Sequence, residues 1–296
     1  MTEKKYDYAV TVLTPAYNRG PLLKILYDSL QKQTVKDFQW LIIDDGSTDD
    51  TRRIAASFSG AGFPVEYHYK ENGGKHTALN FSHPYIRGEL VIIVDSDDYL
   101  TEDAVETILT DWEKCKNIPG IAGFSFLKMR PNGLILSKAP PRDYYVSDFI
   151  HYRTNQHVDG DQCEVTRADI FKIYPFPVYR DERFMSEGIL WRAIGRNYKT
   201  VYRSKPIYIC EYLEGGLTKS GRAFRMKNPY GMMENCRSFF YPEIGLSIKL
   251  KEAILYDVYA LCTKEGLLHW IKTSGAAGLC LMALPLGMFF YRKWAP

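Results

Sequence analysis

A strand-like run that ends in acids, at residues 88–100 (GELVIIVDSDDYL), constrains this chain more than any other stretch. Its aliphatic residues Val91, Ile92, Ile93 and Val94 do not alternate with polar ones, which is typical of a strand buried on both faces. Asp95, Asp97 and Asp98 follow at once, and like charges so close together repel one another. One Asp would be enough to cap the helical pattern that begins at Thr101. Three carboxylates after a buried strand instead favour a site for a hard cation.

The rest of the first hundred residues alternates between strand and helix patterns. Three more strand patterns (YAVTVLT, FQWLIID and PVEYHY) are each followed by a helical pattern, and residues 20–33 carry leucines at helical spacing. Repeated strand–helix units indicate a parallel sheet with helices on its faces. We therefore predict an α/β fold with a mostly parallel sheet flanked by helices. Helical patterns from about Pro229 to Trp270 predict a C-terminal helical extension.

Composition bounds the class of protein. The chain has 296 residues, 46% of them hydrophobic and 25% charged, as expected for a globular protein with a sizeable core. A formal net charge of only +3 does not mark a nucleic-acid binder, so we expect no nucleic-acid partner. The six cysteines form no CxxC pair and no metal-ligand spacing. No cationic and apolar signal peptide opens the chain, so we expect a cytoplasmic protein with reduced cysteines.

The C-terminal stretch departs from this soluble pattern. It has no charged residue from Gly275 to Tyr291, and Arg292 and Lys293 follow. This uncharged stretch is short for a transmembrane helix and contains Pro285. Two readings stay open: residues 275–294 insert at a membrane interface, or they pack on the body of the protein.

A second strand pattern also ends in acids. Asp44 and Asp45 stand where the strand at FQWLIID meets its turn. Taken alone, they could belong to an ordinary turn that caps the next helix. Adjacent strands of a parallel sheet end at the same edge, however. We therefore expect both groups of aspartates to share one crevice with Thr14, Pro15 and Ala16. A crevice that acidic suits Mg²⁺ or Mn²⁺ together with substrate phosphates.

The segment KENGGKHTALN lies between the two acidic strand ends. Its two glycines allow the backbone to approach a ligand, and Lys75 can offset phosphate charge at a helix start. No Gly-Lys-Ser/Thr sequence completes a P-loop, and no GxGxxG follows the first strand. The missing motifs argue against two other functions, an NTPase and a dinucleotide-dependent oxidoreductase.

Four blocks, in this order, resemble the nucleotide-sugar domain of family-2 glycosyltransferases with the Rossmann-like GT-A fold. They are VTVLTPAYNRGPLLKILYDSLQKQT, FQWLIIDDGSTDDT, NGGKHTALN and GELVIIVDSDDYL. A looser likeness continues to residue 220, where MSEGILWRAI and CEYLEGGLTKS resemble the acceptor half of capsule, teichoic-acid and lipopolysaccharide enzymes. The resemblance implies a nucleotide-binding half at 1–105, an acceptor half at 106–225 and a helical extension at 226–296. It also implies an inverting, metal-dependent enzyme of hexosyltransferase type that uses a nucleoside-diphosphate sugar.

The resemblance assigns roles residue by residue. Thr14, Pro15, Ala16 and Asp45 would line the pocket for the nucleobase and ribose, with Asp44 beside them. Lys75 and Asn80 would flank the nucleotide, and the tract from Asp95 through Ser96 to Asp97 matches the family's Asp-x-Asp. Asp97 is then the expected direct ligand of Mn²⁺ or Mg²⁺, whereas Asp95 holds the ribose or a metal-bound water. In this role the metal stabilises the negative charge on the leaving nucleotide.

An inverting transfer needs a general base that takes a proton from the acceptor hydroxyl. The family usually supplies it from a Glu-Asp pair at a helix start, but here the pair reads Glu187-Gly188. We take Glu187 as the base; the bland reading makes it an ordinary first-turn residue after Ser186. Asp159 and Asp161 are the rival acids. Trp191 and Arg192 are candidates for the wall of the site, although core packing suits Trp191 better.

The sequence thus predicts transfer of a sugar from a donor of the uridine-diphosphate type to a glycan or lipid-linked glycan. This reaction would be a step in cell-surface polysaccharide or glycolipid synthesis at the cytoplasmic face of the membrane. A sugar-phosphate nucleotidyltransferase is the rival enzyme, but it needs a Gly-rich basic loop where this chain reads TPAYNRGPLL. A non-catalytic nucleotide- or sugar-binding module is the other alternative, and it would not need the metal acids and Glu187 together.

Overall fold

The structure is a computed structural model that describes residues 5–58, 60, 62–179, 182–210, 221–263 and 265–294. The chain divides into two compact units. The sheet unit comprises Met1–Asp148, Val158–Pro175 and Asn197–Glu211, and the helical unit comprises Phe149–His157, Phe176–Arg196 and Tyr212–Pro296. Part of the expected acceptor half therefore belongs to the same unit as the expected extension. The boundary at residue 225 stays a prediction.

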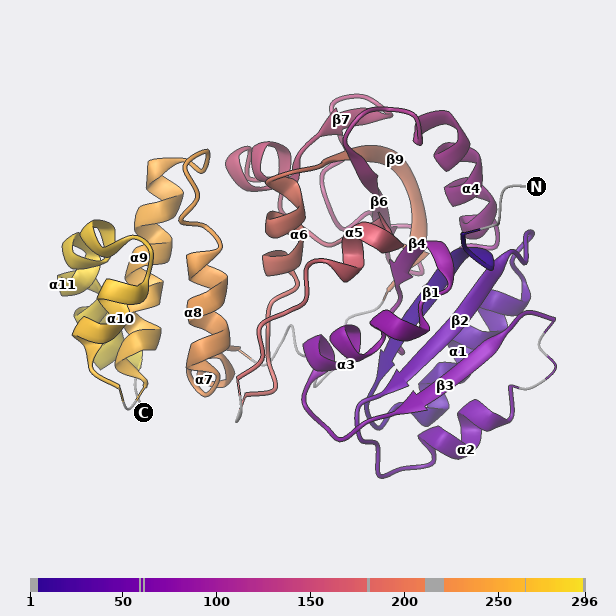
Figure 1. Ribbon diagram of the computed structural model, residues 1–296, viewed down its shortest axis with the longest axis horizontal. Coiled ribbons are helices and arrows are strands. Elements are labelled where there is room, and N and C mark those ends of the chain that lie inside the picture. Colours follow the sequence, from indigo (N-terminus) through magenta and orange to yellow (C-terminus); the bar gives the residue numbers. More distant parts are fainter. Residues whose placement is uncertain are drawn as a thin grey trace. The chain divides into compact units, whose positions relative to one another are not determined.

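Four parallel strands form one side of the sheet and lie next to one another in Figure 1. Their order is β3 (Val65–Tyr69), β2 (Phe38–Asp44), β1 (Tyr8–Ala16) and β4 (Gly88–Ile93). Every residue of β2 is buried, as is most of β1, so these strands are covered on both faces. The expected strand–helix units are confirmed here.

The other side of the sheet has mixed strand directions. The order continues with β8 (Gln162–Arg167), β6 (Ile121–Met129), β9 (Lys199–Ile209) and β5 (Tyr99–Leu100), and β7 (Tyr145–Ser147) pairs with β9. Among the described strands of this part, only the pair of β6 and β9 is parallel. The antiparallel pairing of β5 with β9 places Tyr208 opposite Leu100, directly after the acids that follow β4.

Short helices join the strands of the sheet unit. They are α1 (Gly20–Gln31), α2 (Thr51–Ala56), α3 (Lys75–Phe81), α4 (Ala104–Cys115) and α5 (Ala168–Lys172), with a 3₁₀ turn at His83–Tyr85. Pro21 in the first turn of α1 has the φ angle that a helix needs. Leu23, Leu26 and Leu30 of α1 are fully buried, as their helical spacing predicts.

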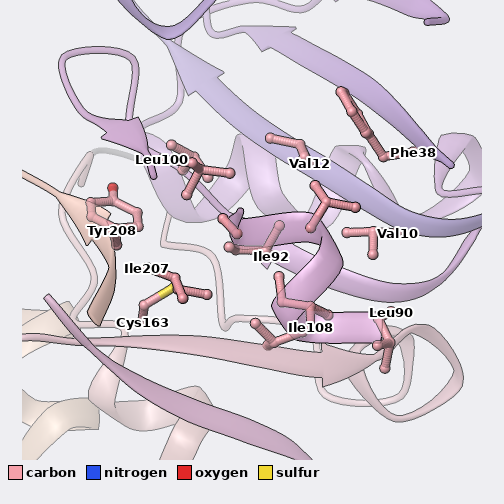
Figure 2. Packing of buried hydrophobic residues seen from close by; sticks show 14 of the residues in the cluster. Val10, Val12, Phe38, Leu90, Ile92, Leu100, Ile108, Cys163, Ile207 and Tyr208 are labelled. Carbon is pink, nitrogen blue, oxygen red and sulfur yellow. The ribbon is translucent and has the colours of Figure 1, made fainter. Parts of the chain in front are cut away.

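The core of the sheet unit joins residues far apart in sequence, as Figure 2 shows. Val12 of β1, Ile92 of β4, Ile108 of α4, Cys163 of β8 and Ile207 of β9 all belong to one buried cluster. Burying a side chain of this kind contributes roughly 1.5–3 kcal/mol. This shared core holds the ends of β4, β5 and β9 in fixed register beside the acids.

The helical unit has its own core. It contains a π-helix at Ile150–Asn155 and the helices α6 (Gly188–Gly195), α7 (Gly221–Met226), α8 (Pro229–Arg237), α9 (Leu246–Leu261), α10 (Leu267–Thr273) and α11 (Ala277–Trp294). Met233, Cys236, Tyr256 and Cys280 belong to the core that α8, α9, α10 and α11 form together (Figure 1). In the described part of the chain, no helix combines the length and the apolarity needed to span a membrane.

Candidate active site

The ends of β1, β2 and β4 lie at one edge of the sheet. Ala16 is aligned with Asp44, and Leu13 is aligned with Ile93. The amide of Val94 donates to the carbonyl of Leu13 over 2.9 Å, which extends this alignment to the start of the second acidic turn. The segment 14–16 and the two acidic turns therefore share the edge where ligands bind in sheets of this kind.

Asp45 is buried and surrounded by donors. Its carboxylate accepts from Lys70 Nζ over 2.6 Å, from the amides of Gly73 and Gly74 over 3.0 and 2.7 Å, and from Asn72 Nδ2 over 3.1 Å. These bonds explain why a glycine turn follows β3, since bare backbone amides must come close to this carboxylate. Asp45 therefore holds the loop that leads into α3.

Asp44 and Thr14 are also occupied by contacts within the protein. Asp44 accepts from the amide of Ser47 over 2.7 Å and from the hydroxyl of Tyr67. Thr14 accepts from Trp40 Nε1 over 3.0 Å and is fully buried, and Pro15 and Ala16 are buried as well. Gly46 follows with φ +86°, and a Cβ there would lie 2.6 Å from the amide nitrogen of Asn72. These side chains thus shape the edge of the sheet from within.

The second acidic turn is built differently. The amide of Asp98 donates to the carbonyl of Asp95 over 3.1 Å and closes a tight turn after β4. The hydroxyl of Tyr208 accepts from the amide of Asp95 over 3.0 Å and donates to Asp98 over 2.7 Å. Asp95 forms an ion pair with Lys75, the first residue of α3. Tyr208 has no sequence motif of its own, and sequence reasoning missed it.

The charged groups at this turn shift one another's pKa values. Burial raises the pKa of Asp95, but the ammonium groups of Lys75 and Lys128 outweigh that and hold the pKa below its ordinary value. Burial, together with the charge of Asp95, raises the pKa of Asp98 to about 7. Lys128 of β6 lies with its ammonium 4.0 Å from the centre of the Tyr208 ring. Lys128 is a second residue at this turn that sequence reasoning missed.

Asp97 is the acid of this turn that the fold leaves open. Within the described residues its half-buried carboxylate makes no hydrogen bond and no ion pair, and Asp95 keeps 36% of its side chain exposed. The described part of the chain holds no cluster of three or more His, Cys, Asp or Glu side chains that could enclose a metal. One or two carboxylates do fit Mg²⁺ or Mn²⁺ that keeps waters and substrate phosphates as its other ligands.

α3 links the two turns. It begins at Lys75, directly after the glycines that bind Asp45, and Asn80 lies half-buried in its last turn. His76 of α3 is buried, and this burial lowers its pKa to about 4, so it is neutral at physiological pH. A neutral His76 leaves Lys75 as the cation that α3 presents to Asp95.

The rival acids, Asp159 and Asp161, are exposed and directly precede β8 in the sheet unit. Burial and the charges of Asp98, Asp161 and Asp95 together raise the pKa of Cys210 to about 12. Asp161 therefore lies in the same electrostatic surroundings as the second acidic turn. This observation keeps it as a serious rival for the role of base.

Glu187 belongs to the helical unit, where it stands at the N-cap of α6. Its carbonyl accepts from the amides of Leu190 and Trp191 over 3.0 and 3.3 Å, and the residue is half-buried. Gly188 stands where the resemblance leads us to expect an Asp. A Cβ at Gly188 would lie 2.9 Å from Nη1 of Arg192, so the guanidinium occupies the space beside this position.

The Arg192 side chain binds residues of the helical unit. Arg192 is buried, donates to Ser238 Oγ and Asn235 Oδ1 over 2.7 Å each, and stacks 3.7 Å from the ring centre of Phe239. Burial lowers its pKa to about 10, so it stays charged at neutral pH. Trp191 is buried as well. Arg192 therefore joins α6 to the end of α8.

Glu182, five residues before Glu187, is a contrasting acid. It is buried and accepts from the amides of Tyr230 and Gly231 over 2.7 and 2.6 Å at the start of α8. Burial raises its pKa above the ordinary value. Its carboxylate therefore fixes the segment that leads to α6.

Comparison with known proteins decides the family. The family model "Glycosyl transferase family 2" matches residues 11–172, which is more than half of the chain. The chain belongs to glycosyl transferase family 2. The matched residues include both acidic turns and α3, and they end before α6. Of the second block that resembles an acceptor half, residues 211–220 lie outside the described residues.

Relatives among curated proteins match over part of the chain. The glycosyltransferase GlyA of Streptococcus pneumoniae is 36% identical over 34% of this chain and 15% of its own length. The chondroitin synthase of Pasteurella multocida is 37% identical over 37% of this chain and 11% of its own. An uncharacterized glycosyltransferase of Rickettsia typhi is 29% identical, with 48% and 44% covered. The chain thus spans less than half the length of these relatives.

Solved structures share the fold. TarS 1–349 of S. aureus in complex with UDP-GlcNAc superposes with a TM-score of 0.56 at 17% identity, covering 96% of this chain and 74% of that one. The mannosyltransferase PcManGT of Pyrobaculum calidifontis in complex with GDP-Man and Mn²⁺ gives 0.57 at 16% identity, with 99% and 86% covered. At these identities the likeness establishes the GT-A fold for this family-2 chain.

Proposed function

We propose that this family-2 protein transfers a hexosyl group from a nucleoside-diphosphate sugar to an acceptor hydroxyl with inversion. One observation carries the proposal: Asp97 presents a carboxylate without a partner among the described residues, at the sheet edge where ligands bind. The fold neighbours TarS and PcManGT, whose complexes hold UDP-GlcNAc and GDP-Man, support a donor of this class.

We propose Asp97 as the direct ligand of Mn²⁺ or Mg²⁺, with Asp95 as the second acid of the metal site. Bound there, the ion would stabilise negative charge on the leaving nucleotide. The Mn²⁺ in the PcManGT complex supports the choice of metal. Lys75 keeps Asp95 ionised and in place through their ion pair, and it brings a positive charge toward the donor's phosphates.

The remaining donor contacts follow from the shape of the sheet edge. Thr14, Pro15 and Ala16 would present backbone to the nucleobase, because their side chains are buried. Asp44 and Asp45 would fix the two loops around the ribose, and Asn80 and Ser96 would contact the nucleotide from α3 and from the second turn. A donor of the uridine-diphosphate type fits this assignment.

Glu187 is the proposed general base that takes the proton from the acceptor hydroxyl. It stands at the N-cap of α6, and the residue is half-buried. Asp161 is the alternative base, because it shares the electrostatic surroundings of Asp95 and Asp98. The acceptor is a glycan or lipid-linked glycan, and the site of action is the cytoplasmic face of the cell membrane.

The test incubates the full chain with UDP-sugars and GDP-mannose in Mn²⁺, in Mg²⁺ and in excess EDTA. We expect slow release of a nucleoside diphosphate in the presence of metal and its loss in EDTA, with Asp50→Asn as an exposed-acid control that keeps full activity. Release of pyrophosphate from a nucleoside triphosphate and a sugar phosphate would instead identify a nucleotidyltransferase. Tight donor binding without any turnover would identify a binding module.

A further inference from the structure

α11 buries small residues and exposes several large apolar ones. Its buried residues are small: Cys280, Ala283 and Gly287. Several of its large apolar residues are exposed instead, with Met282 at 68% and Phe289 at 57% of their surface, whereas Leu279 and Leu284 pack partly buried against the core. The others that are exposed in this way are Leu281, Leu286 and Met288. Amphipathic helices of soluble proteins bury the large residues, so this reversal sets α11 apart.

The contact with α9 keeps the helix in this orientation. A Cβ on Gly287 would lie 2.6 Å from Cβ of Asp257 and 3.4 Å from the carbonyl oxygen of Ile254, both on α9. Only a glycine allows this approach, so the small face is matched to α9 and a larger side chain could not replace it there. The exposed large residues therefore stay on the outer face of α11.

The outer face also carries charge of one sign. Arg292 and Lys293 are exposed and continue the helical spacing of Met282, Leu286 and Phe289. The exposed Arg222 of α7 places its guanidinium 4.1 Å from the ring centre of Trp294, which adds a third cation at this end. Residues 275–294 contain no Asp or Glu.

We propose that the outer face of α11 docks on an anionic lipid bilayer. Met282, Leu286 and Phe289 enter the boundary between headgroups and acyl chains, while Arg292 and Lys293 bind lipid phosphates. A second copy of the chain fits this face less well. A symmetric dimer would bring the cations of one copy close to the same cations of the other, and these would repel one another. The proposal does not depend on glycosyl transfer, and it can hold or fail by itself.

The test is flotation of the full chain with vesicles of phosphatidylcholine, with and without phosphatidylglycerol. We expect the chain to float with the anionic vesicles. The double variant Leu286→Gln/Phe289→Gln should lower partitioning about tenfold or more, because each side chain loses apolar burial. Ile173→Gln is the matched control: Ile173 is 59% exposed but lies in the sheet unit, so its substitution should change nothing. Equal thermal unfolding of all variants shows that the fold is kept.

The charge is tested separately. Arg292→Gln and Lys293→Gln should each weaken binding to anionic vesicles about fivefold, and added salt should weaken it in the wild type. Flotation that is equal for wild type and the Leu286→Gln/Phe289→Gln variant would overturn the proposal. So would a stable dimer in the absence of vesicles that this variant dissociates, since a second copy would then cover the face.

Discussion

The two acidic turns of the sheet unit look alike in sequence but differ in how their carboxylates are used. Both follow strands with long apolar runs, and both lie at the same edge of the sheet. In the first turn the protein itself binds Asp44 and Asp45. In the second turn Asp97 makes no hydrogen bond or ion pair with any described residue. The comparison separates acids that hold the fold from acids that are available to a ligand.

The difference has a local cause. The loop after β3 carries Lys70 and the amides of Gly73 and Gly74, and together they surround Asp45. The same loop offers the second turn a single cation, Lys75, which pairs with Asp95. A carboxylate that is half-buried and unpaired is costly unless a cation arrives. The second turn therefore has the electrostatics of a site that binds its partner from solution.

The substitution Asp97→Asn should break this comparison most strongly. Losing the ligand charge should lower transfer by about 10³-fold or more and weaken donor binding in Mn²⁺, because the ion supplies several kcal/mol to the transition state. Stability should hardly change, since Asp97 has no partner in the described structure to lose. The measurements are donor turnover, nucleotide affinity with and without Mn²⁺, and thermal unfolding. Wild-type turnover by this variant, or by the wild type in excess EDTA, would remove the metal assignment.

A base outside both turns should give the next largest effect. Glu187→Gln keeps the shape of the side chain but cannot accept a proton, so transfer should fall by about 10²–10⁴. Nucleotide binding should stay near normal, because binding of the donor does not need this proton transfer. The measurement is single-turnover transfer beside the donor's dissociation constant.

The rival acids Asp159 and Asp161 provide the controls for that substitution. Asp159→Asn and Asp161→Asn should retain transfer if Glu187 is the base. An inactive Asp161→Asn together with a fully active Glu187→Gln would move the role to Asp161, whose charge already acts on the surroundings of Asp95 and Asp98. In that case Glu187 only starts α6.

A substitution in the first turn should lower the stability of the fold. Asp45→Asn leaves the mostly buried ammonium of Lys70 without its carboxylate and opposes amide donors with another donor. Breaking a buried pair in this way costs roughly 3–5 kcal/mol in free energy of unfolding. Asp50→Asn is the control, because its ion pair with Arg53 is exposed and its loss should change little. Chemical denaturation measures both variants, and equal stability of Asp45→Asn and the wild type would contradict a structural role.

Much of the sheet unit could be predicted from the sequence, but the use of each acid could not. The apolar run before Asp95 and the spacing of Leu23, Leu26 and Leu30 identify a buried strand and a helix, because burial leaves a local pattern. The antiparallel direction of β8 beside β4 leaves no such pattern, since a strand buried on both faces reads the same either way. The structure was needed to find it.

The contacts of the second turn were hidden for a related reason. Tyr208 lies more than a hundred residues after Asp95, and nothing local distinguishes it among 22 tyrosines. It reaches the turn only because β5 pairs with β9. Likewise, the uncharged stretch after Gly275 was visible in the sequence, but only the contact of Gly287 with α9 shows which face of α11 is outside.

Asp257 of α9 is a third kind of acid and gives the smallest expected effect. It is fully buried beneath α11, and neither carboxylate oxygen has a hydrogen-bond partner within the described residues. Burial raises its pKa from 3.8 to about 7. The folded state therefore holds a proton that the unfolded chain releases above pH 4. Its contribution to stability is present below pH 4 and is lost as the pH rises through about 7.

Asp257→Asn removes this titration without changing the shape of the side chain. Between pH 5 and pH 8 the wild type should lose roughly 2–3 kcal/mol of unfolding free energy relative to the variant, as a shift of this size implies. Denaturation at the two pH values measures the difference, with Asp97→Asn as a control that should follow the wild type. Parallel pH profiles for wild type and Asp257→Asn would mean that the carboxylate is already solvated or paired in the folded chain. If the unfolding free energy of Asp257→Asn instead exceeds that of the wild type by more as the pH rises, the destabilising acid is Asp257, which lies in the contact between α9 and α11. The destabilisation then comes from neither acidic turn.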